Sequence, residues 1–233
     1  MNLKNPENLV LNNEFHVKQA IIYQKQWSKE IQIKPIPETV NYVAGIDIGY
    51  DYPSNRAFTI AILLNAQSLE PIEITKAITS IDIPYKPGFL SFREVPALCR
   101  ALDQLSIKPD LIVCDGQGIA HPRRFGLACH IGLAYDIPTI GCGKSKLYGY
   151  AQEPGNERGD YSYLYDRQKN IIGAVLRNKF NVKPLFISAG HKADLASALA
   201  WILKLSKGYR LPEPTRLADK LAHEYKLASL NIS

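Results

Sequence analysis

Three carboxylates stand at places where a charge is costly unless it has a partner. Asp47 interrupts the apolar run YVAGIDIGYD, and Asp115 follows directly on the apolar run LIVC. Glu94 lies in the expected first turn of a helix, where a carboxylate suits the positive end of the helix dipole. Taken one at a time, each acid has a plainer explanation. Asp47 would form a salt bridge or stand at a strand edge, Asp115 would form a turn, and Glu94 would cap its helix. Together we expect them to collect a divalent cation that prefers oxygen ligands, such as Mg²⁺.

Basic side chains follow the acids along the chain and would suit a phosphodiester backbone. They are His121, Arg123, Arg124, Lys144 and Lys146. Each one alone is most simply a solvated surface charge. The formal net charge of +6 and the sequence pI of about 9.0 fit a polyanionic partner, although a modest excess is weak evidence. A metal held by the acids would then polarise a bound phosphate and activate water.

A mixed α/β scaffold must bring these groups together. Strands are expected at 42–51, 57–64 and 71–83, and their short links predict an antiparallel meander. Apolar spacing predicts helices over about 14–32, 92–105, 124–135 and 192–205, the last of these being the last strong helix. Further strands are expected at 111–114, 139–141, 171–176 and 185–188. The economical interpretation is one mixed α/β domain over residues 1–233.

Composition excludes several other classes of protein. Hydrophobic residues make up 46% of the 233 residues, which is enough for a substantial core. The four cysteines, at 99, 114, 129 and 142, form no C-x-x-C pair, so neither a zinc site nor a disulfide framework is expected. The polar N-terminus MNLKNPENLVLNNEF has no signal-peptide core, and no run of about 18 apolar residues occurs. We therefore expect a reduced, cytoplasmic protein without membrane contact.

Six blocks of the sequence together resemble the endonuclease V family, whose members cut nucleic acid beside deaminated purines. The blocks are AGIDIGY (44–50), PYKPGFLSFRE (84–94), PDLIVCDGQGIAHPRRFGLACHIGL (109–133), IPTIGCGKSKLYG (137–149), PLFISAGHKADLASAL (184–199) and GYRLPEPTRLADK (208–220). They cover most of the chain in the expected order. The resemblance implies an RNase H-like fold, a central mixed β-sheet flanked by helices, which agrees with the strand order read above.

The same resemblance implies an activity and its residues. The activity is hydrolysis of the second phosphodiester bond 3′ to deoxyinosine, leaving 3′-hydroxyl and 5′-phosphate ends, in DNA repair. Asp47, Glu94 and Asp115 match the acidic positions that bind Mg²⁺, for which Mn²⁺ would substitute. His191 matches a histidine that completes the active-site group, and Lys144 a lysine near the scissile phosphate. The partner would be DNA containing deoxyinosine, with inosine-containing RNA as an alternative substrate.

In the implied mechanism, metal-activated water attacks phosphorus in line. Glu94 would hold or orient the water or a second ion, Lys144 would offset charge in the transition state, and His191 would orient water or protonate the leaving oxygen. Asp194 stands three residues after His191 and would hold its imidazole or assist a second metal.

The segment PYKPGFLS (84–91), here called the wedge loop, corresponds to the family's wedge at the lesion. Tyr85 matches its aromatic tip, Pro84 and Pro87 limit its freedom, and Gly88 lets the backbone turn. An enzyme that reads an altered base usually takes it out of the stack, so a side chain must fill the gap. The plainer interpretation is a strand–helix connection with a buried tyrosine. Lys86 departs from relatives, which are often apolar there.

The base pocket implied by the resemblance is lined by backbone groups and includes a histidine in the lesion-side loop. The residues expected there are Gly88, Leu90, Gly116, Gln117, Gly118, Ile119 and His121. Two rival functions are open at this point. Another RNase H-like nuclease, such as a junction resolvase or hybrid-cleaving enzyme, would lack the PYKPGFLS and DGQGIAHPRRFG blocks. A non-catalytic nucleic-acid-binding module would have no need of three costly acids.

Overall fold

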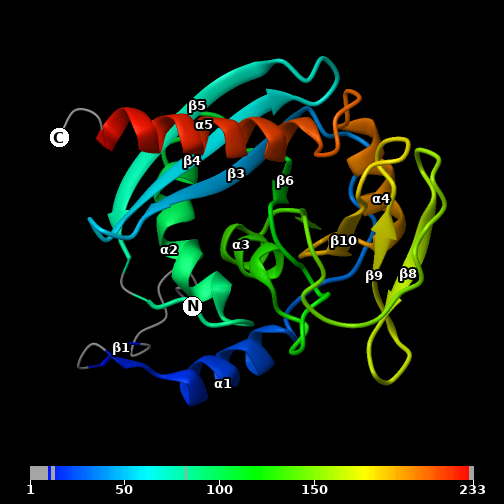
Figure 1. Cartoon of the computed structure of the whole chain (residues 1–233), viewed down its shortest axis with the longest axis horizontal. Helices are drawn as coiled ribbons and strands as arrows, with labels where there is room; N and C mark the ends of the chain where they lie inside the picture. The colour runs from blue at the N-terminus through cyan, green and yellow to red at the C-terminus, as the bar shows by residue number, and fades with distance from the viewer. Residues whose placement is uncertain (1–9, 12–13, 82, 231–233) are drawn as a thin grey trace.

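An eight-stranded mixed sheet with helices on both faces forms the scaffold in the computed structural model, which describes residues 10–11, 14–81 and 83–230 (Figure 1). The elements in chain order are β1 Val10–Leu11, β2 Glu14–Phe15, α1 Val17–Trp27, β3 Tyr42–Asp51, β4 Arg56–Asn65, β5 Pro71–Ser80, α2 Leu90–Leu102, β6 Leu111–Cys114, α3 Leu127–Tyr135, β7 Thr139–Gly143, β8 Tyr161–Tyr165, β9 Ile171–Leu176, β10 Leu185–Ala189, α4 Leu195–Lys204 and α5 Glu213–Leu230. The strand order across the main sheet is β5-β4-β3-β6-β7-β10-β9-β8.

The first three strands of this sheet form the antiparallel meander that the sequence predicts. β3 pairs with β4 along its whole length, from Tyr42 opposite Asn65 to Asp51 opposite Arg56. β6 then adds to the other edge of β3 in parallel, and β7 adds to β6 in parallel. The predicted fold class, an RNase H-like mixed sheet flanked by helices, is confirmed.

Alternation along β3 decides which side chains meet which helix. Ala44 and Ile46 pack into the apolar cluster that α2 and α3 cover. The opposite face carries Gly45, Asp47 and Gly49, and α5 lies directly on it (Figure 1). A Cβ on Gly45 would lie 2.0 Å from the carbonyl oxygen of Pro214 in α5, so only glycine permits this approach. Asp47 therefore stands on the face that α5 covers.

An aromatic cluster joins α1 to the side of the molecule that carries α2 and α3. Trp27 of α1 lies 6.0 Å from Phe92 and 5.8 Å from Phe125, measured between ring centroids. Phe89 of the wedge loop belongs to the same buried cluster. In Figure 1, α1 lies at the bottom of the view and α5 at the top. The N-terminal helix is thus tied to the loop that precedes α2.

Several predicted helix boundaries are wrong for identifiable reasons. α1 spans only Val17–Trp27 of the expected 14–32, since Glu14 pairs in β2. α3 begins at Leu127 because Arg124 has a φ of 54°, in the left-handed region. α4 begins at Leu195, after Lys192 with a φ of 49°. α2 begins at Leu90, two residues before the predicted start, so Glu94 lies beyond the first turn.

Four elements were not predicted at all, which are the short strands β1 and β2, the edge strand β8 and the long helix α5. Pro212 and Pro214 interrupt the helical pattern at the start of α5, although Leu217, Ala218, Leu221 and Ala222 follow at helical spacing.

Some predictions fall on residues that the structure does not describe. The prediction that the N-terminal segment has no signal peptide includes residues 1–9 and 12–13, which lie outside the described residues. Asp82, inside the predicted strand 71–83, does so too. Within the described part of the chain, no helix combines the length and apolarity needed to cross a membrane.

Candidate active site

Three aspartates from three elements come together at the sheet. Ile46 of β3 pairs with Cys114 of β6, so Asp47 and Asp115, one residue further along each strand, lie side by side. Asp219 reaches them from α5. One carboxylate oxygen from each lies within 4.8 Å of the others. We call Asp47, Asp115 and Asp219 the acid cluster.

The acid cluster is electrostatically costly by itself. The pKa of Asp47 is raised to about 7, first by burial and then by the charge of Asp115, against the opposing effect of Lys144. Burial also raises the pKa of Asp115, which its ion pair with Lys144 only partly offsets. Two buried carboxylates with raised pKa values beside a third carboxylate call for a cation, and oxygen-only ligands suit Mg²⁺, Mn²⁺ or Ca²⁺. The donor set therefore fits a hard divalent metal.

Lys144 is the cation that the chain itself supplies. Its Nζ lies 2.6 Å from Asp115 and 2.5 Å from Asp219. Burial lowers the pKa of Lys144, but the two carboxylates outweigh this effect and raise the pKa above its ordinary value. Arg210 donates to the backbone carbonyl of Lys144 at 2.8 Å and fixes the chain there. An ammonium group thus lies beside the acid cluster at all ordinary pH values.

Glu94 lies near the acid cluster without joining it. The Tyr50 hydroxyl donates to its carboxylate at 2.8 Å. The pKa of Glu94 is raised to about 8 by burial and by the charges of Asp47 and Asp115, against the hydrogen bond from Tyr50. The Glu94 carboxylate is thus within electrostatic reach of both strand acids, while its oxygens stay outside the closely spaced group of three.

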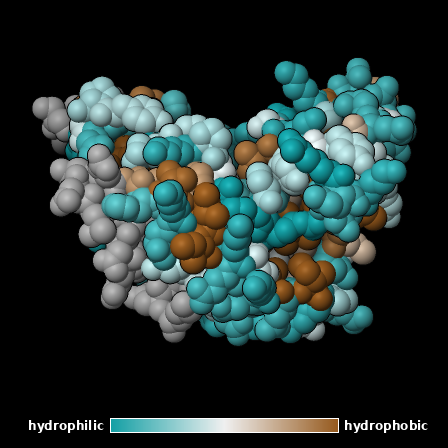
Figure 2. All heavy atoms as spheres, turned by 90° about the horizontal axis from the view of Figure 1, so that it is seen from below, coloured by the Kyte–Doolittle hydropathy of each residue, from teal (hydrophilic) through white to brown (hydrophobic). Residues whose placement is uncertain are grey.

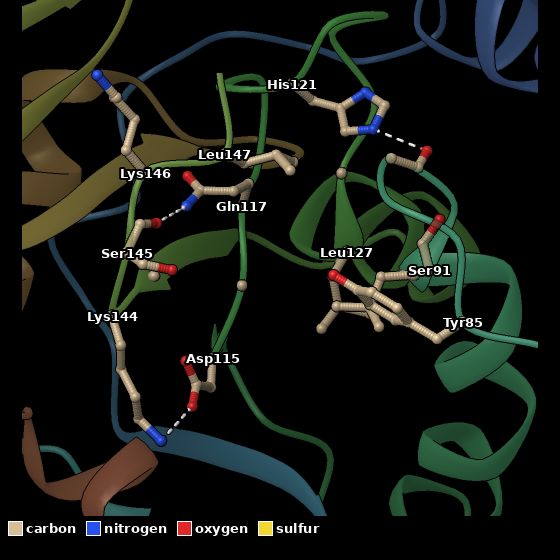
Figure 3. Close-up of a pocket in the computed structure, with 15 residues that line it drawn as sticks. Tyr85, Ser91, Asp115, Gln117, His121, Leu127, Lys144, Ser145, Lys146 and Leu147 are labelled. Carbon is tan, nitrogen blue, oxygen red and sulfur yellow. Dashed lines mark hydrogen bonds and ion pairs between the residues drawn. The ribbon is translucent and has the colours of Figure 1, made fainter. Parts of the chain in front are cut away.

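A cavity of about 420 Å³ opens next to Asp115 and Lys144 (Figure 3). Tyr85 and Ser91 form one wall, and the segment after β7 forms the opposite wall with Ser145, Lys146 and Leu147. Leu90 also lines the cavity. The turn after β6 contributes further lining residues, which are Gly116, Gln117 and His121. The Tyr85 side chain is 59% exposed, so it is not the buried tyrosine of the plainer interpretation. The wedge loop and Asp115 therefore share one cavity.

Not every residue predicted for the base pocket lines this cavity. A Cβ on Gly118 would lie 2.0 Å from the Ala189 carbonyl oxygen, so Gly118 serves close packing under β10. The Ile119 side chain packs into the apolar core. Lys86 is exposed, with its Nζ 5.8 Å from the ring centroid of Phe15, and Pro84 and Pro87 are exposed beside it.

The structure does not bring His191 to the acids, which corrects the expectation that it completes the active-site group. Its backbone N–H donates to Thr139 at the start of β7, whereas Lys144 follows the end of that strand. Its Nε2 lies 3.1 Å from a carboxylate oxygen of Asp136. The expected partner, Asp194, instead caps α4 by accepting from the Ser197 amide at 2.8 Å. His191 and Asp194 therefore lie at the opposite end of the sheet strands from Asp115.

Asp219 is the member of the acid cluster that the sequence reasoning missed. It lies in the block GYRLPEPTRLADK, whose resemblance to the family was noted without a role for the aspartate. The available signal was the helical spacing of α5 together with the glycines of β3, which require a close neighbour on that face. A helix packed on that face brings Asp219, four residues after Thr215, beside Asp47.

Comparison with known proteins gives one consistent result. Residues 25–220 match the family model for Endonuclease V. Endonuclease V of Dictyoglomus turgidum is 43% identical over 213 residues, covering 91% of this chain and 90% of that protein. The crystal structure of endonuclease V from Streptomyces avermitilis superposes with a TM-score of 0.89 at 34% identity, covering 99% of this chain and 100% of that one.

A more distant structure has the same fold with nucleic acid bound. It is Ciona intestinalis endonuclease V in complex with a 24mer DNA containing an inosine followed by a ribo-adenosine. Its TM-score is 0.79 at 23% identity, covering 92% of this chain and 98% of that one. The family model and the close relative, each spanning most of the chain, show that this protein belongs to the endonuclease V family of endonucleases.

Proposed function

We propose that the whole chain, residues 1–233, is one endonuclease domain that recognises deaminated purines in DNA. It hydrolyses the second phosphodiester bond 3′ to deoxyinosine and leaves 3′-hydroxyl and 5′-phosphate ends. The observation that carries this proposal is the shared cavity, in which the wedge loop faces Asp115 and Lys144. A rival nuclease of the same fold would need the acids but no aromatic wedge next to them, and a non-catalytic module would need no acid cluster.

The proposed metal ligands are Asp47 and Asp115 from the sheet and Asp219 from α5, with Glu94 at the edge of the site. A bound divalent ion would supply Lewis-acid activation of the phosphate and of water. We infer Mg²⁺ because oxygen ligands and partial retention of water suit it, and Mn²⁺ would substitute.

The chain's own residues supply orientation and charge. The Lys144 ammonium, beside Asp115, would stabilise negative charge on the phosphate oxygens in the transition state. The Glu94 carboxylate, held by Tyr50, would accept a hydrogen bond from the attacking water. His191 has no part in this proposal, because it lies at the other end of β7.

The wedge loop and the cavity would have separate roles in recognition of the deaminated purine. Tyr85 is exposed and would fill the gap in the stack when the purine turns out of the duplex. The cavity beside it would take the base, between Leu90 and Gly116. Hydrophilic side chains make up most of the face shown in Figure 2, and the outline of the molecule is notched between two raised ends. A polar surface of this kind suits a nucleic-acid duplex.

A cleavage assay tests the proposal directly. A duplex with one deoxyinosine, the same duplex without it and an inosine-containing RNA would each be incubated with Mg²⁺ and with chelator. RNA belongs in the assay because the Ciona relative binds an inosine followed by a ribo-adenosine. We expect one nick, at the second bond 3′ to the lesion, only in the presence of metal. Equal cutting of the undamaged duplex, or cutting in chelator, contradicts the proposal.

A further inference from the structure

One backbone carbonyl in the wedge loop receives three side-chain donors. The Gly88 oxygen accepts from Gln24 Nε2 at 3.0 Å, from His121 Nε2 at 3.0 Å and from Arg123 Nη2 at 2.7 Å. Gly88 has a φ of +78°, and a Cβ there would lie 2.9 Å from Arg123 Nη2. A carbonyl oxygen has two lone pairs, so three donors saturate it. The backbone angle favours glycine here, and a Cβ would displace the Arg123 guanidinium from its contact with the carbonyl.

The orientation of each donor is fixed by a second contact. Arg123 Nε donates to Gln24 Oε1, which leaves the amide nitrogen of Gln24 facing Gly88. The Arg123 backbone N–H donates to His121 Nδ1 at 3.1 Å, which leaves the ring proton on Nε2. Burial, reinforced by the Arg123 charge, lowers the pKa of His121 to about 4, so the ring stays neutral at pH 7.

Little freedom remains in this group of side chains. The Gln24 side chain is fully buried and His121 is 2% exposed. The guanidinium carbon of Arg123 lies 4.4 Å from the ring centroid of Phe89, the next residue of the wedge loop. Gln24 also approaches the Phe125 carbonyl at 3.4 Å. Replacing one of these buried donors by an acceptor would set two oxygens against each other, which costs far more than losing a surface contact.

We propose that Gln24, His121 and Arg123 are positioning residues that hold the Gly88 carbonyl and so preset the wedge loop for the lesion. This inference rests on the proposed function of the cavity, of which Gly88 and His121 are part of the wall. Gln24 acts from α1, and it precedes the range 25–220 that matches the family model. The N-terminal helix thus serves recognition although it does not line the cavity.

Substitution of Gln24 by glutamate removes the amide donor and keeps the size and shape of the side chain. Gln24→Glu keeps an oxygen for Arg123 but turns a negative oxygen toward the Gly88 carbonyl. The matched control is Gln26→Glu, the same change at an exposed position on the same helix. The measurements are dissociation constants for inosine-containing and undamaged duplexes without metal, the single-turnover rate at saturating substrate, and amide hydrogen exchange in residues 84–89.

For Gln24→Glu we expect binding of the inosine duplex to weaken by about tenfold, the equivalent of one lost buried hydrogen bond. Binding of the undamaged duplex and the saturated rate should stay within about threefold of wild type, since phosphate contacts and chemistry are untouched. Exchange in residues 84–89 should accelerate, and Gln26→Glu should change nothing. Gln24→Met, which lacks both polar atoms, repeats the test if the glutamate variant does not fold.

Two results would overturn the inference. One is a folded Gln24 variant whose loop exchange and inosine affinity equal those of wild type. The other is equal weakening toward both duplexes, which would make α1 a general scaffold. If wild-type protein fails to distinguish the two duplexes, the proposed function fails instead, and the exchange measurement still decides whether Gln24 holds the loop.

Discussion

The acid cluster and the wedge loop meet at one cavity, yet the chain positions them by different means. Asp47 and Asp115 stand on paired strands, whose register alone sets them side by side. The wedge loop is not part of a paired strand. Its Gly88 is held instead by side chains from α1 and from the turn before α3. Regular structure thus fixes the chemistry, whereas a few buried polar contacts fix recognition. The two regions should therefore respond differently to substitution.

The largest expected effect is in the acid cluster. Asp47→Asn removes a metal-binding charge while keeping the size of the side chain, so cleavage of inosine DNA should fall by a factor on the order of 10³. Thermal stability should stay the same or rise, because burial makes this charge costly in the metal-free protein. Cleavage assays and thermal unfolding in chelator check both points. A variant that retains the wild-type nicking rate would remove Asp47 from the site.

The second prediction sharpens the choice between Asp219 and His191. Asp219→Asn should lower the cleavage rate by about 10²-fold or more, since Asp219 belongs to the acid cluster and contacts Lys144. His191→Gln should leave the rate within about threefold and lower stability instead, because its contacts are to Thr139 and Asp136. Single-turnover rates and unfolding temperatures distinguish them, and a stronger rate defect in His191→Gln would reverse the assignment.

The sequence predicted the acid cluster better than its surroundings, for physical reasons. An acid inside or directly after an apolar strand is conspicuous, although the parallel pairing that sets Asp47 beside Asp115 joins β3 to β6 across 68 positions, from Ile46 to Cys114. Asp219 was missed because its position depends on the packing of α5 across β3, which no local pattern states. His191 was misplaced because the strand–turn segment SAGHKADL does not reveal at which end of the sheet its turn lies.

Recognition was harder to predict than chemistry. Sequence resemblance pointed to the wedge loop, and the structure brings Tyr85 to the cavity wall. The contacts that hold the loop join Gln24 to Gly88 across 64 positions and to Phe125 across 101 positions. A buried glutamine on an otherwise amphipathic helix gives only a faint signal. Its partner can be found only when the tertiary structure is known.

A third, smaller effect is expected at the tip of the wedge loop. Tyr85→Ala should weaken binding of an inosine duplex by about tenfold or more, because loss of one aromatic stacking contact is worth about 1–3 kcal/mol. Binding of an undamaged duplex should not change, since Tyr85 is exposed and forms no part of the core. Fluorescence anisotropy with both duplexes measures the difference, and Tyr209→Ala, at another exposed tyrosine, is the control. Unchanged discrimination would contradict the wedge role.

The two regions should also differ in the sign of their pH dependence. The folded-state pKa of Asp47 is about 7 against an ordinary 3.8, so this group binds more protons in the native state. Its contribution to stability is present at low pH and is lost as pH rises toward about 7. The folded-state pKa of His121 is about 4 against 6.5, so here the unfolded chain binds more protons. Its contribution is present above about pH 6.5 and is lost as pH falls toward about 4.

His121→Gln isolates the second of these slopes. Glutamine can still donate to the Gly88 carbonyl but does not titrate, so the variant should lose less stability than wild type on acidification. The difference should approach about 3 kcal/mol of unfolding free energy between about pH 6.5 and about pH 4. Urea unfolding of both proteins in chelator measures it, and the acid cluster contributes equally to each. Identical slopes would show that the native fold does not lower the pKa of His121, which would contradict a neutral ring that accepts from the Arg123 backbone N–H throughout this pH range.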